Sequence, residues 1–198
     1  ASLEDRIKQH FMWDYDPAYV KEMMVPDFDP HMSLAVFAGA LTQDDVDFFH
    51  EIKRRKKHNE KDENDQIEIT DEEKKRFDKV SKIRHEYKTT NYAAQYGTGA
   101  ETLSINLGIS KSKAAKIIEV YWGRNWAVKK VAERCIVKEI DGQKWLLNPI
   151  CNFWYSLRAE KDRFSTLCQG GGVYCFDTWI RKFMSKRHQL TGQFHDEV

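Results

Sequence analysis

Strand signals occur only in the C-terminal third of this sequence, and that distribution most limits the folds that the chain can adopt. Asp141-Gly142, a pair typical of a tight hairpin turn, separates the segments RCIVKEI and QKWLLNPI. The only other segment that we interpret as a strand is 190–195. Elsewhere apolar residues recur at helical spacing. We therefore predict an α+β fold that is dominated by helices.

Proline, glycine and capping residues mark the ends of the expected helices. Asp29-Pro30 precedes an apolar helix that we expect to begin at about His31. Thr70, followed by Glu73, has the pattern of a capping box and predicts another helix start. Helical spacing also appears in residues 3–24, which include an aromatic loop, and in the ranges 81–96 (ended by Gly97), 109–123, 127–139 and 162–188.

Charged residues predominate between Thr42 and Lys82. The stretch KRRKKHNEKDENDQ, residues 53–66, contains no apolar residue at all. We interpret it as the solvated end of a helix followed by a loop, and the alternative is a basic patch that contacts phosphates.

Composition adds a few limits. The chain has 32 Lys and Arg against 31 Asp and Glu, so its net charge of +1 does not by itself indicate a nucleic-acid-binding protein. Its four cysteines include no C-x-x-C pair, which favours reduced thiols over a disulfide or zinc framework. Because no signal peptide or long apolar run occurs, we expect a cytoplasmic protein that does not enter a membrane.

The chemically most informative segment is RHEYKTTNYAAQYG, residues 84–97. Two cations one helical turn apart, Arg84 and Lys88, repel each other by a few tenths of a kcal/mol, roughly, and so call for a compensating anion. A polyphosphate would fit, with Tyr92 beside an attached sugar or base. The alternative is a surface helix whose tyrosines pack in the core. Six side chains fall within less than half of the helix circumference: Arg84, Lys88, Asn91, Tyr92, Gln95 and Tyr96.

This segment closely resembles motif B of the DNA polymerase I family (family A), whose fingers helix reads R-x3-K-x3-(F/Y)-x3-YG. Five further segments resemble other blocks of that family, in the family's order. They are ASLEDR (the end of motif A), DPHMSLA (the block before the fingers helix), DGQKWLLNPI (a hairpin), CQGGG (the start of a long helix) and QFHDEV (motif C).

The resemblance implies an enzyme that performs template-directed DNA synthesis. In this family two Mg²⁺ ions, held by two palm aspartates, activate a primer 3′-hydroxyl that attacks a deoxynucleoside triphosphate. The implied partners are a DNA primer–template and other replication proteins. The implied architecture is a partial palm plus fingers: residues 1–30 in the palm, 31–130 in the fingers with a charged insertion at about 42–72, and 131–198 in the palm.

Roles carry over residue by residue. Asp196 matches the metal-binding catalytic aspartate of motif C, Glu197 its auxiliary carboxylate, and His195 the histidine that approaches the primer end and the DNA. Arg84 and Lys88 match the cations that grip the triphosphate. Lys88 also matches the proton donor to the leaving pyrophosphate.

The remaining roles surround the same nucleotide. His31 matches a residue that touches its phosphates, Tyr92 one that stacks beside its sugar and base, and Tyr96 one that stacks near the templating base. Glu4 matches a glutamate that blocks a ribose 2′-hydroxyl, which implies deoxynucleotides. Gln169 matches a glutamine that contacts DNA from the minor groove.

Several positions depart from the family pattern. Ser165 stands where relatives usually have asparagine, and Gln143 stands where they have arginine. The long charged segment after His31 suggests a phage-type enzyme acting in an infected bacterial cytoplasm. The motif A aspartate would lie two residues before Ala1, so we expect a fragment that does not polymerise DNA alone.

Two other interpretations stay open. A single-subunit RNA polymerase shares the motif B logic, but Glu4 and the acidic residue Glu197 after His195-Asp196 favour DNA as the product. A helical nucleic-acid-binding module without catalysis is the other alternative. It would have no reason to keep Asp196 together with Lys88.

Overall fold

The computed structural model describes residues 3–62 and 65–184 of the chain. The chain divides into a central unit, Ala18–Trp126, and a terminal unit that combines Ala1–Pro17 with Ala127–Val198. The described residues are mostly helical and include one three-stranded sheet. The predicted helix-dominated α+β class is therefore confirmed, whereas the palm and fingers identities stay predictions.

The central unit is built from helices packed around a core of apolar side chains, among them Met32, Leu34 and Tyr121. No helix in the described ranges is long and apolar enough to cross a membrane. The helices that belong to it are α2 (Pro17–Met23, which starts at the boundary), α3 (Pro30–Phe37), α4 (Gln43–Asn59), α5 (Asp71–Gln95), α6 (Ala100–Leu107) and α7 (Lys111–Arg124).

Helix α5 is a single helix of 25 residues. The predicted capping box is present, since Thr70 and Glu73 bond reciprocally, and Tyr96 caps the other end before Gly97, whose φ is 69°. Separate helices were expected to start at Thr70 and at about residue 81, and this division is wrong. No glycine or proline lies between the caps, so nothing interrupts the hydrogen-bond ladder.

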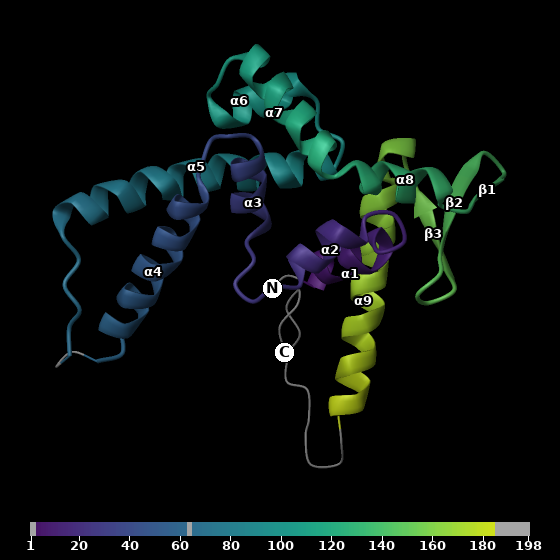
Figure 1. The fold of residues 1–198 in the computed structure, drawn as a ribbon. Helices are drawn as coiled ribbons and strands as arrows, with labels where there is room; N and C mark the ends of the chain where they lie inside the picture. Colours follow the sequence, from purple (N-terminus) through teal and green to yellow (C-terminus); the bar gives the residue numbers. More distant parts are fainter. Residues whose placement is uncertain (1–2, 63–64, 185–198) are drawn as a thin grey trace. The chain divides into compact units, whose positions relative to one another are not determined.

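The charged segment after Thr42 is helix α4 and the loop that follows it. Figure 1 shows α4 and α5 side by side. They pack through Phe49 and Phe77, whose rings stack in parallel with centroids 4.9 Å apart, and through the fully buried Ile52. The basic residues of α4 gather in its last turns, where they complement the helix dipole. The prediction of a solvated helix end is confirmed.

Helix α6 was not predicted. It is joined to α7 by a turn in which Gly108 adopts φ 63°, a conformation that favours glycine, and Ser110 caps α7 by accepting from Lys113 N. Of its eight residues, Leu103 is the buried one. A single buried apolar residue gives no helical periodicity that the sequence could reveal. Helix α7 ends at Arg124, one residue after the expected Gly123.

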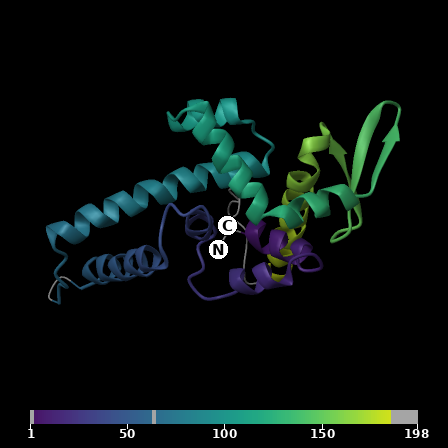
Figure 2. The same cartoon turned by 45° about the horizontal axis from the view of Figure 1, so that its top comes forward.

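The terminal unit packs helices against the sheet. Asp141 and Gly142 both have positive φ, 51° and 75°, and Ile140 pairs with Gln143, so the predicted hairpin is confirmed. The helix expected to reach residue 139 instead ends at Arg134. The sheet, drawn in green in Figure 2, has three antiparallel strands. The elements are α1 (Leu3–Met12), α8 (Trp126–Arg134), β1 (Val137–Ile140), β2 (Gln143–Asn148), β3 (Phe153–Leu157), the 3₁₀ turn η1 (Glu160–Asp162) and α9 (Arg163–Phe183).

Helix α9 approaches the sheet so closely at Gly170 that this position requires glycine, because a Cβ atom there would lie 2.7 Å from the Tyr155 ring. A Cβ atom on Gly171 would lie 2.9 Å from Ile150 Cδ1, the end of a flexible side chain that can shift. Glycine inside a helix costs about 1 kcal/mol relative to alanine. Close packing offsets this cost, and the Tyr155 hydroxyl also donates to the Gly170 carbonyl at 3.2 Å.

Lys8 of α1 is an unusual member of the interior. The side chain is only 1% exposed in a unit where α1 packs on α9. Burial lowers the pKa of its ammonium group to about 8, although the charge of Asp5 opposes this shift. A buried lysine therefore makes the stability of this unit depend on pH.

We predict that Lys8→Met removes part of that pH dependence. Between pH of about 8 and 10.5 the unfolded lysine holds more protons than the folded one, so wild-type stability receives a contribution that rises with pH. The variant should lack this contribution and gain about 1–3 kcal/mol of unfolding free energy at pH 7. Denaturant unfolding at pH 7 and 9.5 measures both effects, with exposed Lys182→Met as control. A variant with wild-type pH dependence contradicts the prediction.

Candidate nucleotide site on helix α5

The candidate site begins with one row of side chains on α5, spaced by four residues from Arg84 to Tyr96. Lys88 is exposed, Tyr92 is 37% exposed, and Arg84 and Tyr96 are half-buried. Not all of the predicted arc is accessible, because two of its residues, Asn91 and Gln95, are buried. The exposed row is what a ligand could reach.

Arg84 has an ionic partner within the chain. Its Nε donates to Asp29 Oδ2 at 2.6 Å, and the Asp29 side chain is only 11% exposed. Burial alone would raise the pKa of Asp29, but the hydrogen bond and the charge of Arg84 outweigh it and lower that pKa. The sequence pattern suggested a bound phosphate as the compensating anion, yet this carboxylate already compensates one of the two cations.

Asp29 also fixes the start of helix α3. Its other oxygen, Oδ1, accepts from the backbone N–H of His31 at 2.9 Å and of Met32 at 3.1 Å, with Pro30 at the first helical position. This is the arrangement expected of an aspartate N-cap before proline. One carboxylate thus caps α3 with one oxygen and holds α5 with the other.

His31 is brought to the α5 row by this cap. It is 7% exposed, and its ring lies 5.6 Å from the Tyr92 ring at a tilt of 55°. Asn91 Nδ2 lies 3.1 Å from His31 Nδ1. If the amide donates in that contact, the neutral imidazole carries its proton on Nε2, which is then a donor suited to an anionic oxygen.

Lys88 is the most accessible cation of the row. It lies one turn from both Arg84 and Tyr92, and it forms no ion pair with any residue in the described ranges. A nearby cation, Lys113 of α7, is directed to Glu86 at 3.4 Å. An anion that reaches this row would therefore meet Lys88 as an uncompensated charge.

The other predicted site residues lie elsewhere or outside the described ranges. Glu4 is half-buried on α1, and Gln169 is exposed on α9, both in the terminal unit. Ser165 Oγ donates to the Asp162 carbonyl at 3.0 Å. The motif C residues His195, Asp196 and Glu197 lie outside the described residues. Within them no cluster of three His, Cys, Asp or Glu side chains could hold a metal ion.

Neither a protein-family model nor a curated protein sequence matches this chain.

A cavity of the central unit has a volume of about 1010 Å³ and shares only Asp29 with the residues described above. Arg84, Lys88, Tyr92 and Tyr96 do not line this cavity.

We predict measurable coupling between Asp29 and Arg84. Asp29→Asn preserves the cap, because asparagine caps helices well, but loses the charge. In a double-mutant cycle with Arg84→Met, the coupling energy from denaturant unfolding should be about 1–2 kcal/mol. Because the folded pKa of Asp29 is lowered, the coupling should be present above the unfolded pKa of about 3.9 and vanish as pH falls through the folded value.

The matched control for this cycle is the exposed pair of Asp71 and Lys74, whose atoms lie 2.9 Å apart on the same helix. Asp71→Asn with Lys74→Met should give no measurable coupling, since water screens such a pair. Equal coupling in both cycles would show that burial does not strengthen the Asp29–Arg84 contact.

Proposed function

We propose that this chain is the nucleotide-binding part of a template-directed DNA polymerase of the family A type, with α5 as its fingers helix. The observation that carries the proposal is the meeting of two sequence blocks. The resemblance assigns DPHMSLA and motif B separately to the same incoming triphosphate, and His31 of the first block lies against Tyr92 of the second. Helical spacing within either block does not require this contact.

The charges of the row support a triphosphate ligand. Lys88 offers an ammonium that forms no ion pair with the described residues. Arg84 contacts Asp29 through Nε, so its terminal Nη groups keep donors for a phosphate. Tyr92 lies one turn beyond Lys88 and offers a ring face to the attached sugar or base. In the leaving-group step, Lys88 can donate a proton to the departing pyrophosphate oxygen.

The described residues supply binding and charge neutralisation. Asp196, the residue that would hold Mg²⁺, lies outside them; bound Mg²⁺ would activate the primer hydroxyl and offset phosphate charge. The proposed substrates are deoxynucleoside triphosphates and a DNA primer–template, and the proposed product is extended DNA. In a chain that also carries the motif A aspartate, Asp196→Ala is expected to abolish synthesis.

Binding by this chain can be measured directly. Lys88→Met should weaken the affinity for a fluorescent deoxyadenosine triphosphate about tenfold, which corresponds to about 1.4 kcal/mol for one charge-assisted contact. The control is Lys82→Met, which removes an equally exposed cation from another face of α5. Equal losses in both variants would indicate non-specific attraction and contradict the proposed site.

Synthesis itself is tested in protein extended by its flanking coding sequence. Tyr92→Phe should sharpen the rejection of dideoxynucleotides severalfold, because the tyrosine hydroxyl can replace the contact of the missing 3′-hydroxyl. Primer extension with mixed deoxy- and dideoxynucleotides measures the incorporation ratio. An unchanged ratio with intact activity would place Tyr92 away from the sugar. Extension with ribonucleotides in preference to deoxynucleotides would favour an RNA polymerase.

A further inference from the structure

The cavity of about 1010 Å³ in the central unit is a groove with an unusual combination of linings. It lies among the segment between α2 and α3, helix α3 itself, and helix α4, with one residue each from α2, α5 and α7. Its size is within the range that accommodates several side chains of a ligand. None of its residues except Asp29 belongs to the proposed nucleotide site.

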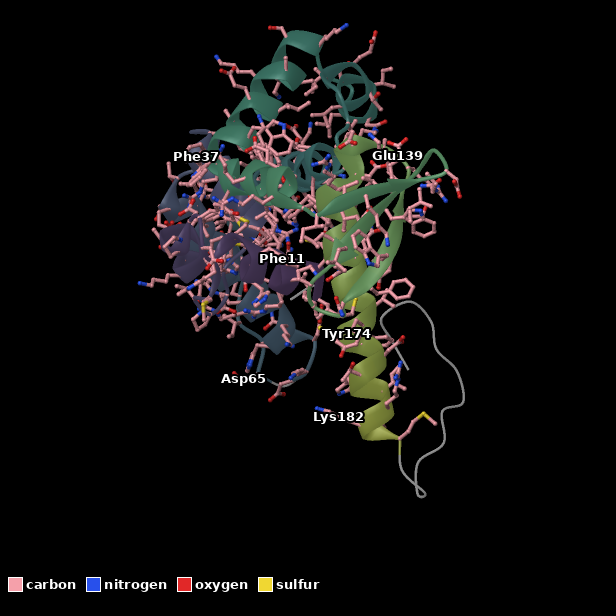
Figure 3. All side chains as sticks on the ribbon, turned by 90° about the vertical axis from the view of Figure 1, so that its right-hand side faces the viewer. Phe11, Phe37, Asp65, Glu139, Tyr174 and Lys182 are labelled. Carbon is pink, nitrogen blue, oxygen red and sulfur yellow. The ribbon has the colours of Figure 1, made fainter. Side chains whose placement is uncertain are left out.

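The first lining is apolar and accessible. Val25 and Phe37 line the groove and are 58% and 53% exposed. Phe48 also lines it and is half-buried, with the Arg76 guanidinium 4.3 Å from its ring centroid. Figure 3 shows Phe37 at the edge of its unit. Exposed apolar side chains that converge on one concavity are typical of interaction sites, whereas singly scattered ones are not.

The second lining is acidic. Six carboxylates border the groove against three arginines, and each arginine is already paired with one of those carboxylates. Arg54 contacts Glu51 at 3.1 Å, and Arg76 contacts Asp44 at 2.5 Å. The third pair joins Arg124 to Glu22.

After these three ion pairs are formed, the lining of the groove keeps a net negative charge. Asp27 forms no ion pair within the described part of the chain, and Asp47 only accepts a hydrogen bond from Gln43 at 2.9 Å. A phosphate or nucleic acid would meet net repulsion here, and a cationic ligand would meet attraction.

We propose that this groove binds a segment of a partner protein in which a bulky apolar side chain is flanked by lysine or arginine. The apolar side chain covers Phe37 and Val25, and the cations meet Asp27 and Asp47. A small cation would satisfy the carboxylates alone, and an apolar ligand would satisfy the rings alone. A peptide segment that carries both an apolar and a basic side chain matches both linings.

The test is selection of short random peptides displayed on phage against the immobilised chain, followed by fluorescence anisotropy with the best synthetic peptide. The selected sequences should combine an aromatic or large aliphatic residue with neighbouring Lys or Arg. Phe37→Ser should weaken binding of that peptide about tenfold, and Asp27→Asn with Asp47→Asn should weaken it severalfold and reduce its dependence on salt.

Matched controls remove equivalent groups outside the groove. Ile105→Ser deletes an apolar side chain that is 76% exposed on α6, and Asp78→Asn deletes an exposed carboxylate on α5. Both should leave peptide affinity unchanged. Lys88→Met should also leave it unchanged, so this result is independent of the proposed nucleotide site.

Three outcomes would overturn the proposal. Selection could yield no peptide or only acidic ones, the selected peptides could bind the groove variants as tightly as the wild type, or an oligonucleotide could compete with the peptide for the groove. Circular dichroism of each variant distinguishes lost binding from lost folding.

Discussion

The arrangement of the candidate site depends on the carboxylate of Asp29. One oxygen caps α3 and the other accepts from Arg84 in the middle of α5. Two helices that are distant in sequence are thereby tied at a single residue, and His31, which follows two positions later, is placed against Tyr92. If the whole Asp29 side chain were removed, the cap, the ion pair and the position of the imidazole would change together.

These two roles of Asp29 explain why its carboxylate is buried although burial of a charge costs free energy. Removing the Asp29 carboxylate from water opposes ionisation, yet the charge of Arg84 and the backbone donors of α3 keep it ionised. Asn91 adds a second tie between the same helices through its contact with His31 Nδ1. The Asn91 contact is buried and the Arg84 contact is partly buried, so the row from Arg84 to Tyr96 stands on a rigid support while Lys88 is exposed. Rigid support beneath an exposed charge is what a site for a mobile, highly charged ligand needs.

Local signals in the sequence were sufficient for the elements whose ends are marked by particular residues. The capping box at Thr70, the cap at Asp29-Pro30 and the turn at Asp141-Gly142 could each be identified because one or two residues determine the backbone there. Strand β3 was missed, because its pairing with β2, and no local turn signal, decides its conformation. Two separate helices were predicted where the structure has α5 alone. This prediction was wrong because a change in composition was interpreted as a break in structure.

The candidate site was predictable only in part, for a related reason. Spacing identifies which α5 residues share a face, but it cannot identify which of them a neighbouring helix covers. Asn91 and Gln95 belong to the predicted arc and are buried, and the partner of Arg84 lies 55 positions away. That partner also changes how Arg84 can act. A guanidinium has five donors in a fixed fork, and Asp29 uses the one on Nε, so the same residue can be oriented by a carboxylate and still present two terminal nitrogens to a phosphate. The ion pair neutralises one of the two positive charges of the row, but it also directs the remaining donors of Arg84. In the proposed site, Lys88 is therefore the main source of attraction for the triphosphate, and Arg84 is the main source of its orientation.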